Sequence, residues 1–280
     1  MNPSHASAKR WATPPLVTAS VGLHALAAGT AVWMPETAAW AMGAVMLNHG
    51  ALAGAGLWPR SRWLGPNLSR LPPAATARQA YALTIDDGPD RKVTPHLLDL
   101  LDELGVRASF FLIAEQVRRQ PGLARDIARR GHDIQNHSHS HRHHFSLLGP
   151  RGIEREVTQA QTILADITDQ VPHCFRAPAG LRNPFLDPVL HRHGLHLVSW
   201  TRRGFDTRDG PVAPVLERLA CGLAAGDVLQ MHDGHAGRTA AGKALVLNLL
   251  PPLVARCHAL GLHAETLRQA VAPRHGGLAS

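Results

Sequence analysis

Cysteine is scarce in this 280-residue sequence, and the few cysteines form no framework. The three that occur are Cys174, Cys221 and Cys257. They make no CxxC pair, and each lies in an apolar run. This usage excludes a disulfide-stapled scaffold. We therefore expect the three cysteines to be small, buried, apolar side chains. The lack of a disulfide framework favours a protein domain located in a reducing compartment.

Aromatic residues are also few, with one Tyr and six Phe beside six Trp. The formal net charge of +8 could suggest a nucleic-acid partner. Such an interface would group basic and aromatic side chains on the folded domain. The shortage of aromatic residues argues against that interface, and no nucleic-acid partner is expected.

Acidic residues are almost missing from residues 1–80, where Glu36 is the only one. The same segment carries six basic residues: Lys9, Arg10, Arg60, Arg62, Arg70 and Arg78. The excess positive charge therefore belongs mainly to the N-terminal segment. We expect that charge to flank a membrane rather than to bind a polyanion.

Two apolar runs without charged residues occupy about residues 15–34 and 38–58. Each has about the 20 residues that a bilayer-spanning helix needs. Tryptophans stand at the ends of both runs, as in an interfacial aromatic belt: Trp11, Trp33, Trp40 and Trp58. The pattern predicts a transmembrane helical hairpin, and the alternative is a pair of marginal helices docked on a soluble domain. A cleaved signal peptide is disfavoured because a second apolar run follows at once.

The polar residues of the two runs fit a hairpin. With a turn near residues 36–37, His24 and His49 lie at matching depth, and we expect His24 to contact Asn48 or His49 because polar groups in a bilayer must find partners. Basic residues stand before the first run and after the second. The positive-inside rule then places both ends, and the domain that follows, in the cytoplasm; the periplasmic or extracellular face is the alternative.

The remainder divides into a linker at 71–80, a domain at 81–272 and a tail at 273–280. Within the domain, apolar runs alternate with helix-like segments, which predicts parallel strands joined by crossover helices in a barrel-like α/β fold of about seven units. The predicted strands are 81–85, 108–113, 132–136, 173–176, 196–200 and 227–231, with 262–264 as a further candidate. The predicted helices are 94–104, 121–130, 153–168, 184–193, 214–224 and 243–260.

Polar side chains with catalytic potential follow the predicted strands. They are Asp86 and Asp87 after the first strand, His137 and His141 after the third, Arg176 at the end of the fourth, Asp206 after the fifth and His232 after the sixth. In α/β barrels these strand ends meet at one rim. One aspartate and the histidine pair could supply three metal ligands and leave a position open for water, with the second aspartate as a general base.

Five motifs in order make residues 79–272 resemble the polysaccharide deacetylases, the NodB-homology domain of carbohydrate esterase family 4. They read TIDDGP at 84–89, HSHSH at 137–141, RAPAG at 176–180, WTRRGFDT at 200–207 and LQMH at 229–232. The resemblance implies a distorted (β/α)7-type barrel. It also implies a hydrolase that removes an N-acyl group, usually acetyl, from an amino sugar.

The resemblance assigns roles to individual residues. Asp87, His137 and His141 are the implied metal ligands, with zinc as first choice and cobalt, manganese, nickel or iron compatible with the same donors. Asp86 is the implied base that activates the water. His232 is the implied acid that protonates the leaving amine. Arg176 would orient Asp86, and Asp206 would partner His232. The implied oxyanion and substrate contacts are Ala179, Gly180, Trp200 and Met231.

Other residues near the motifs are expected to have simpler roles. His139, His143 and His144 are not expected to bind the metal, and Asp90 and Asp133 are interpreted as turn and cap residues. Three positions depart from the family pattern and make the pocket wall uncertain: Ala179, Thr207 and Gln230.

Three arginines lie close to the motifs: Arg182, Arg202 and Arg203. One hypothesis is that they meet a phosphate, as in a lipid-linked sugar. Surface arginines without a ligand are the alternative. The expected substrate is a polysaccharide, oligosaccharide or glycolipid. The alternative functions are a deformylase or O-deacetylase on the same fold, or a membrane-anchored carbohydrate-binding protein without activity.

Overall fold

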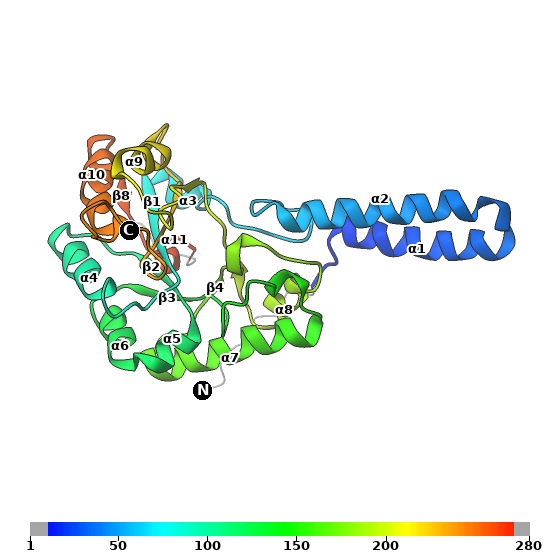
Figure 1. Cartoon of the computed structure of the whole chain (residues 1–280), viewed down its shortest axis with the longest axis horizontal. Coiled ribbons are helices and arrows are strands. Elements are labelled where there is room, and N and C mark those ends of the chain that lie inside the picture. The colour runs from blue at the N-terminus through cyan, green and yellow to red at the C-terminus, as the bar shows by residue number, and fades with distance from the viewer. Residues whose placement is uncertain (1–10, 272–280) are drawn as a thin grey trace, which may run out of the picture.

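A computed structural model describes residues 11–271 of the chain. Its most extended feature is an antiparallel helical hairpin that projects from a compact α/β domain (Figure 1). The hairpin consists of α1 (Pro15–Trp33), the short 3-10 helix η1 (Pro35–Thr37) and α2 (Ala38–Leu57). The predicted tail at 273–280, and the basic residues Lys9 and Arg10, lie outside the described residues.

Polar contacts cross between the two hairpin helices. His24 Nε2 lies 3.0 Å from His49 Nε2, which confirms the predicted contact, and Asn48 donates to Ser20 Oγ at 2.7 Å. Of the described helices, only α1 is long and apolar enough to cross a membrane by length and composition. Glycines, alanines and the Asn48–His49 pair lower the hydropathy of α2.

The domain is built on a curled sheet whose strand pairs are all parallel. Its strands are β1 (Ala80–Asp86), β2 (Ser109–Leu112), β3 (Asp133–Asn136), β4 (Cys174–Phe175), β5 (His196–Leu197), β6 (Arg202–Arg203), β7 (Val228–His232) and β8 (His263–Ala264). The order is β5-β4-β3-β2-β1-β7-β6, with β8 beside the start of β1. The predicted α/β barrel is confirmed.

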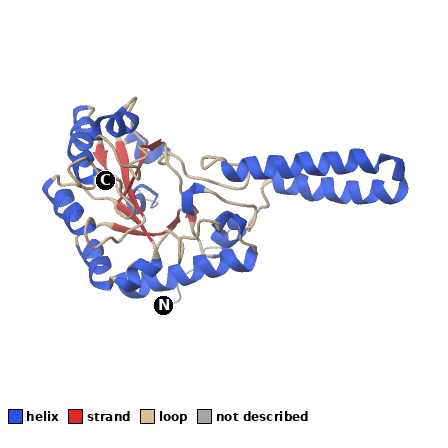
Figure 2. Cartoon of the chain, in the orientation of Figure 1, coloured by secondary structure: helices blue, strands red, loops and turns tan. Residues whose placement is uncertain are grey.

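Helices cover the outside of this sheet (Figure 2). They are α3 (Pro73–Ala77), α4 (Thr94–Glu103), α5 (Ala114–Arg119), α6 (Pro121–Arg129), α7 (Pro150–Thr168), α8 (Leu186–Arg192), α9 (Val212–Ala220), α10 (Leu245–Ala259) and α11 (Leu267–Val271). The 3-10 helices η2 (Phe145–Leu147) and η3 (Pro178–Gly180) lie in loops. The sequence did not predict β6, α3, α5 or α11, which are short.

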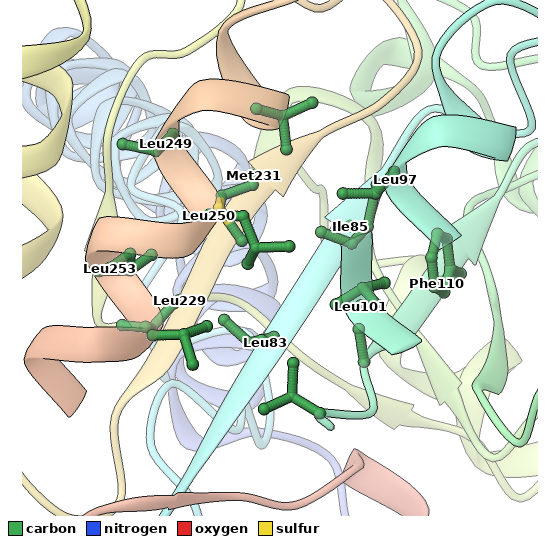
Figure 3. Packing of buried hydrophobic residues seen from close by; sticks show 14 of the residues in the cluster. Leu83, Ile85, Leu97, Leu101, Phe110, Leu229, Met231, Leu249, Leu250 and Leu253 are labelled. Carbon is green, nitrogen blue, oxygen red and sulfur yellow. The ribbon is translucent and has the colours of Figure 1, made fainter. Parts of the chain in front are cut away.

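Successive side chains of β1 and β7 point alternately into the hydrophobic core and into the barrel interior, where the site lies. Leu83 and Ile85 of β1, with Leu229 and Met231 of β7, face α4 and α10 in the main apolar cluster (Figure 3). Successive side chains of a strand point to opposite faces, so Thr84, Asp86, Gln230 and His232 face the barrel interior. Burial of each large apolar side chain contributes about 1.5–3 kcal/mol to stability.

The segment after the hairpin closes the sheet beyond β5. Leu68 pairs with Val198 in a parallel bridge, and its carbonyl accepts a hydrogen bond from Ser199 N. Leu71 N donates to the Gly226 carbonyl on the other side of the domain. Residues 66–71, which the sequence placed in the N-terminal segment and linker, thus cover the interval between the two ends of the curled sheet.

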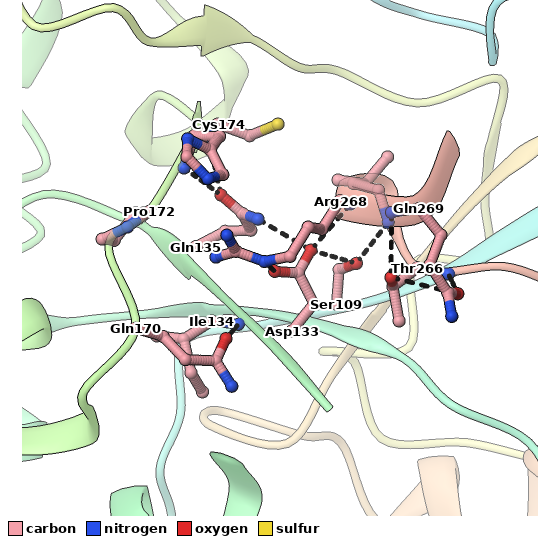
Figure 4. Close-up of polar contacts among 12 residues, drawn as sticks. Ser109, Asp133, Ile134, Gln135, Gln170, Pro172, Cys174, Thr266, Arg268 and Gln269 are labelled. Carbon is pink, nitrogen blue, oxygen red and sulfur yellow. Dashed lines mark hydrogen bonds and ion pairs between the residues drawn. The ribbon is translucent and has the colours of Figure 1, made fainter. Parts of the chain in front are cut away.

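A buried polar network secures the opposite end of the barrel (Figure 4). The Asp133 carboxylate accepts hydrogen bonds from Ser109 Oγ, Gln135 Nε2 and both the backbone and side chain of Arg268. Asp133 begins β3, and it caps α11 because its carboxylate accepts from the Arg268 N–H in the first turn of that helix, which agrees with its predicted role as a turn or cap residue. The prediction for Asp90 is confirmed, because its Oδ1 accepts from the backbone of Lys92 and Val93 in a turn.

Candidate active site

A buried ion pair lies at the centre of the rim. Arg176 Nη1 donates to Asp86 Oδ1 at 2.5 Å, and Gln230 Nε2 donates to Asp86 Oδ2 at 2.7 Å. Burial alone would raise the pKa of Asp86, but the Arg176 guanidinium, with His137, His232 and Gln230, holds it below its usual value. Asp86 is therefore ionised at neutral pH, as a general base must be.

Arg176 is itself held in place by further acceptors. Its guanidinium donates to Thr84 Oγ1 and to the backbone carbonyls of Val198 and Ser199, and it lies 4.0 Å from the centre of the Phe111 ring. A buried charge is tolerated only when it is paired and hydrogen-bonded. These contacts satisfy that condition and fix the position of Asp86.

Asp87, His137 and His141 form a compact group of possible ligands. Asp87 Oδ1 lies 3.2 Å from Nε2 of each histidine and, although buried, has no hydrogen-bond partner among the described residues. His137 Nδ1 lies 2.8 Å from the Arg176 carbonyl oxygen. A carbonyl oxygen can only accept a hydrogen bond, so Nδ1 carries the proton and donates it, and Nε2 keeps its lone pair. Burial, and then the neighbouring His137, lowers the pKa of His141 to about 4. Both histidines can thus serve as neutral ligands, and this donor set fits a divalent metal.

The loop that carries these histidines also contains His139, His143 and His144, and none of the three belongs to the ligand group. Sequence reasoning missed His235, whose Nδ1 lies 3.4 Å from Asp87 Oδ2 and whose ring stacks on that of His141 at 6.5 Å. The sequence feature that could have placed His235 near the site is its position three residues after His232, the last residue of β7.

His232 and Asp206 form the opposite side of the site. Asp206 is fully buried and accepts from both His232 Nδ1 and His232 N at 2.8 Å. Burial alone would lower the pKa of His232, but the hydrogen bond and charge of Asp206, with the charges of Asp86 and Asp87, raise it to about 9. The imidazole is then protonated at neutral pH and can donate a proton from Nε2.

The loop of the third motif is clamped by the base of the hairpin. Ala179 and Gly180 have positive φ values of 55° and 74°. A Cβ at position 180 would lie 2.6 Å from Trp200 Cη2 and 2.8 Å from Pro59 Cβ. Pro59 lies two residues after the end of α2, so the N-terminal segment touches the wall of the site.

Three side chains that the sequence placed at the rim lie elsewhere: Met231, Arg182 and Arg202. Met231 is buried in the core, because it faces the side of β7 opposite to His232. Arg182 is buried and donates to the Ser61 carbonyl at 2.5 Å. Arg202 pairs with Asp227 at 2.5 Å, at the far end of β7 from His232. Trp200 does lie at the wall but is only 6% exposed.

Comparisons with known proteins relate both the sequence and the fold to carbohydrate deacetylases. The family model for polysaccharide deacetylase matches residues 74–198. A peptidoglycan-N-acetylglucosamine deacetylase of Bacillus cereus is 29% identical over 189 residues, covering 67% of this chain and 87% of the relative. A chitooligosaccharide deacetylase of Sinorhizobium fredii is 30% identical over 169 residues, covering 60% and 78%.

The fold of this chain is also similar to that of a solved carbohydrate esterase structure. The family 4 carbohydrate esterase from Streptomyces lividans, in complex with acetate, superposes with a TM-score of 0.62 at 28% identity, covering 69% of this chain and 97% of that one. The fold and site define a hydrolase of the carbohydrate-deacetylase class. The chain belongs to the polysaccharide deacetylase family.

The clamp on Gly180 predicts an asymmetry between two Gly→Ala variants. Gly105 also has a positive φ, of 66°, but a Cβ there would meet nothing within 4 Å. Both variants should lose about 1 kcal/mol to backbone strain, and Gly180→Ala should lose about 1–3 kcal/mol more through overpacking and lose activity. Chemical denaturation and kcat/KM measure both effects; equal losses in the two variants would contradict the clamp.

The His232–Asp206 pair predicts a shifted pH profile. In Asp206→Asn the charge that raises the pKa is gone, so burial dominates and the pKa of His232 falls. The acid form is then lost at lower pH, and the alkaline limb of kcat should move down by at least about two pH units, with about a tenfold loss at pH 8. Asp209→Asn, an exposed neighbour, is the control. An unchanged alkaline limb in Asp206→Asn would exclude His232 as the titrating acid.

Proposed function

We propose that this chain removes the acetyl group from the nitrogen of an amino sugar in a polysaccharide, oligosaccharide or lipid-linked saccharide. The observation that carries the proposal is the arrangement of Asp86, an ionised carboxylate held by Arg176, between a three-ligand group and a protonated His232. Relatives that deacetylate peptidoglycan N-acetylglucosamine and chitooligosaccharides support an N-acetyl substrate.

One divalent metal, with zinc as first candidate, would be held by Asp87, His137 and His141. When bound, it would act as a Lewis acid on the acyl carbonyl and make a water molecule more acidic. The orphaned Asp87 Oδ1 and the two available Nε2 atoms support this assignment.

The chain's own groups then carry the proton transfers. Asp86 accepts a proton from the attacking water, and Arg176 and Gln230 hold the carboxylate in the orientation that this requires. The backbone N–H of Ala179 is the proposed donor to the negative charge that develops on the carbonyl oxygen of the acyl group. His232 donates its Nε2 proton to the amine nitrogen, which is a poor leaving group until it is protonated.

The role of Asp86 predicts the behaviour of Asp86→Asn. The wild-type chain should release acetate from an N-acetylated chitooligosaccharide and leave a free amine. The variant should lose about a hundred- to ten-thousandfold in kcat, the range that general-base catalysis contributes. Mass spectrometry and an acetate assay follow the products, with Asp99→Asn on α4 as the control. Formate as the only product, acetate from esters alone, or a fully active Asp86→Asn would overturn the proposal.

The hairpin is proposed to anchor the domain in a membrane. Its outer surface exposes large apolar side chains, among them Val21, Leu26, Val32 and Leu47. Trp33 and Trp40 stand at the tip, and Trp58 and Trp63 at the base, as two interfacial belts would. The His24–His49 and Asn48–Ser20 pairs give the internal polar groups partners. The basic residues after α2 favour a cytoplasmic domain.

Two measurements test this anchor. The full chain should stay with the membrane fraction after a carbonate wash, and Leu26→Arg with Leu47→Arg should release it, whereas Leu147→Arg on the domain should not. Cys221 is the exposed cysteine of the domain, while Cys174 and Cys257 are buried. An impermeant maleimide should therefore label Cys221 in lysed but not in intact cells. Soluble wild-type protein would contradict the anchor, and labelling in intact cells would contradict the orientation.

A further inference from the structure

Two arginines beside the active site share an aromatic ring and have no carboxylate partner among residues 11–271. The Cζ atoms of Arg203 and Arg208 lie 5.0 and 5.9 Å from the centre of the Phe205 ring. Arg203 Cζ also lies 5.2 Å from the centre of the Trp200 ring. Arg203 Nε is buried and has no hydrogen-bond partner in the described part of the chain.

This environment is unusual for two cations. A buried donor without an acceptor costs free energy, and two guanidinium groups on one ring repel each other. Arg202, the neighbour of Arg203, shows the ordinary solution, with Asp227 and the carbonyls of Cys221 and Gly222 as acceptors. The donors of Arg203 and Arg208 are thus available to an external anion.

The position of these arginines connects them to the catalytic groups. Phe205 is 44% exposed, has a positive φ of 60°, and directly precedes Asp206, which holds His232. Trp200, the other aromatic ring beside Arg203, lies against Gly180. The centre of its ring is 5.9 Å from Arg176 Cζ. An anion bound at Arg203 and Arg208 would therefore lie beside the catalytic groups.

The base of the hairpin contributes a third cation. Arg60 Nη1 lies 3.5 Å from the carbonyl of Thr201, the residue between Trp200 and Arg202, and its side chain is exposed. Because Arg60 follows α2 by only three residues, this side of the rim adjoins the proposed membrane anchor. A charged group bound here would lie between the bilayer surface and the catalytic residues.

We propose that Arg203 and Arg208, with Arg60, bind a phosphate ester that joins the saccharide to a membrane lipid. This inference rests on the proposed function and narrows its substrate class. Guanidinium groups offer several N–H donors in a fixed plane and match phosphate oxygens. A phosphodiester carries one negative charge, as a carboxylate does, but its tetrahedral oxygens can accept hydrogen bonds from arginines on different sides, whereas the two oxygens of a carboxylate lie in one plane. The exposed face of Phe205 offers an apolar contact for the adjoining sugar or lipid.

The test compares two N-acetylated saccharides that differ in one group. One carries a short lipid through a phosphodiester, and the other carries the same lipid through a neutral glycosidic bond. The wild-type chain should prefer the phosphodiester in kcat/KM. In Arg203→Ala and in Arg208→Ala this preference should fall about tenfold, mainly through KM, and Arg203→Lys should fall less. Arg155→Ala, which removes an exposed charge on α7, should keep the wild-type ratio.

The remaining outcomes separate the possible sources of the anion. A wild-type ratio near one overturns the proposal, and so does a ratio that stays unchanged in both variants while they unfold at the wild-type denaturant concentration. The proposal is also overturned if the wild-type chain prefers a carboxylate-linked saccharide over the neutral one as strongly as it prefers the phosphodiester. Weaker binding of the variants to vesicles of anionic phospholipid, with an unchanged substrate ratio, would assign the arginines to lipid headgroups instead. Failure to release acetate from either saccharide would contradict the proposed function itself, whereas a misfolded variant lowers both rates and leaves the ratio intact.

Discussion

The buried pair of Asp86 and Arg176 is the interaction on which the rest of the site depends. One guanidinium orients the carboxylate, and the carbonyl of the same residue fixes the ring of His137. The strand end of β1, the ligand loop after β3 and the loop after β4 are therefore set by a single residue. Removal of one member of such a pair costs about 3–5 kcal/mol, because the other charge stays buried without a partner. The hydrogen bonds to Thr84 and to two backbone carbonyls explain why the pair is tolerated in the interior.

Around this pair the protein moves two pKa values in opposite directions. Arg176, together with His137, His232 and Gln230, outweighs the burial of Asp86 and keeps it ionised. Asp206, together with the charges of Asp86 and Asp87, outweighs the burial of His232 and keeps it protonated. Groups whose environments separate their pKa values in this way can act as base and acid at one pH. Strand alternation makes the arrangement possible, since Asp86, Gln230 and His232 face the barrel while their neighbours in sequence pack against helices.

Features that depend on residues close together in the sequence could be predicted from the sequence alone. Each catalytic motif follows a strand, and strand ends of a parallel barrel meet at one rim, so the grouping of Asp86, Asp87, His137, Arg176 and His232 could be predicted. The contact between His24 and His49 followed from helix depth alone. Pairings between distant segments could not be predicted in this way: Arg182 with the hairpin base, Arg202 with Asp227, Asp133 with α11, and residues 66–71 with β5. Met231 was misplaced because a motif names neighbours in sequence, whereas a strand sends them to opposite faces.

The central claim is that two adjacent aspartates have different functions, with Asp87 as a metal ligand and Asp86 as a base that does not bind the metal. Metal content by mass spectrometry, measured on the purified full chain after equilibration with zinc, tests this claim most directly. Wild type and Asp86→Asn should each hold about one zinc per chain, and Asp87→Asn should hold almost none, since a three-ligand site that loses its carboxylate binds far more weakly. A metal lost from Asp86→Asn and kept by Asp87→Asn would contradict the account.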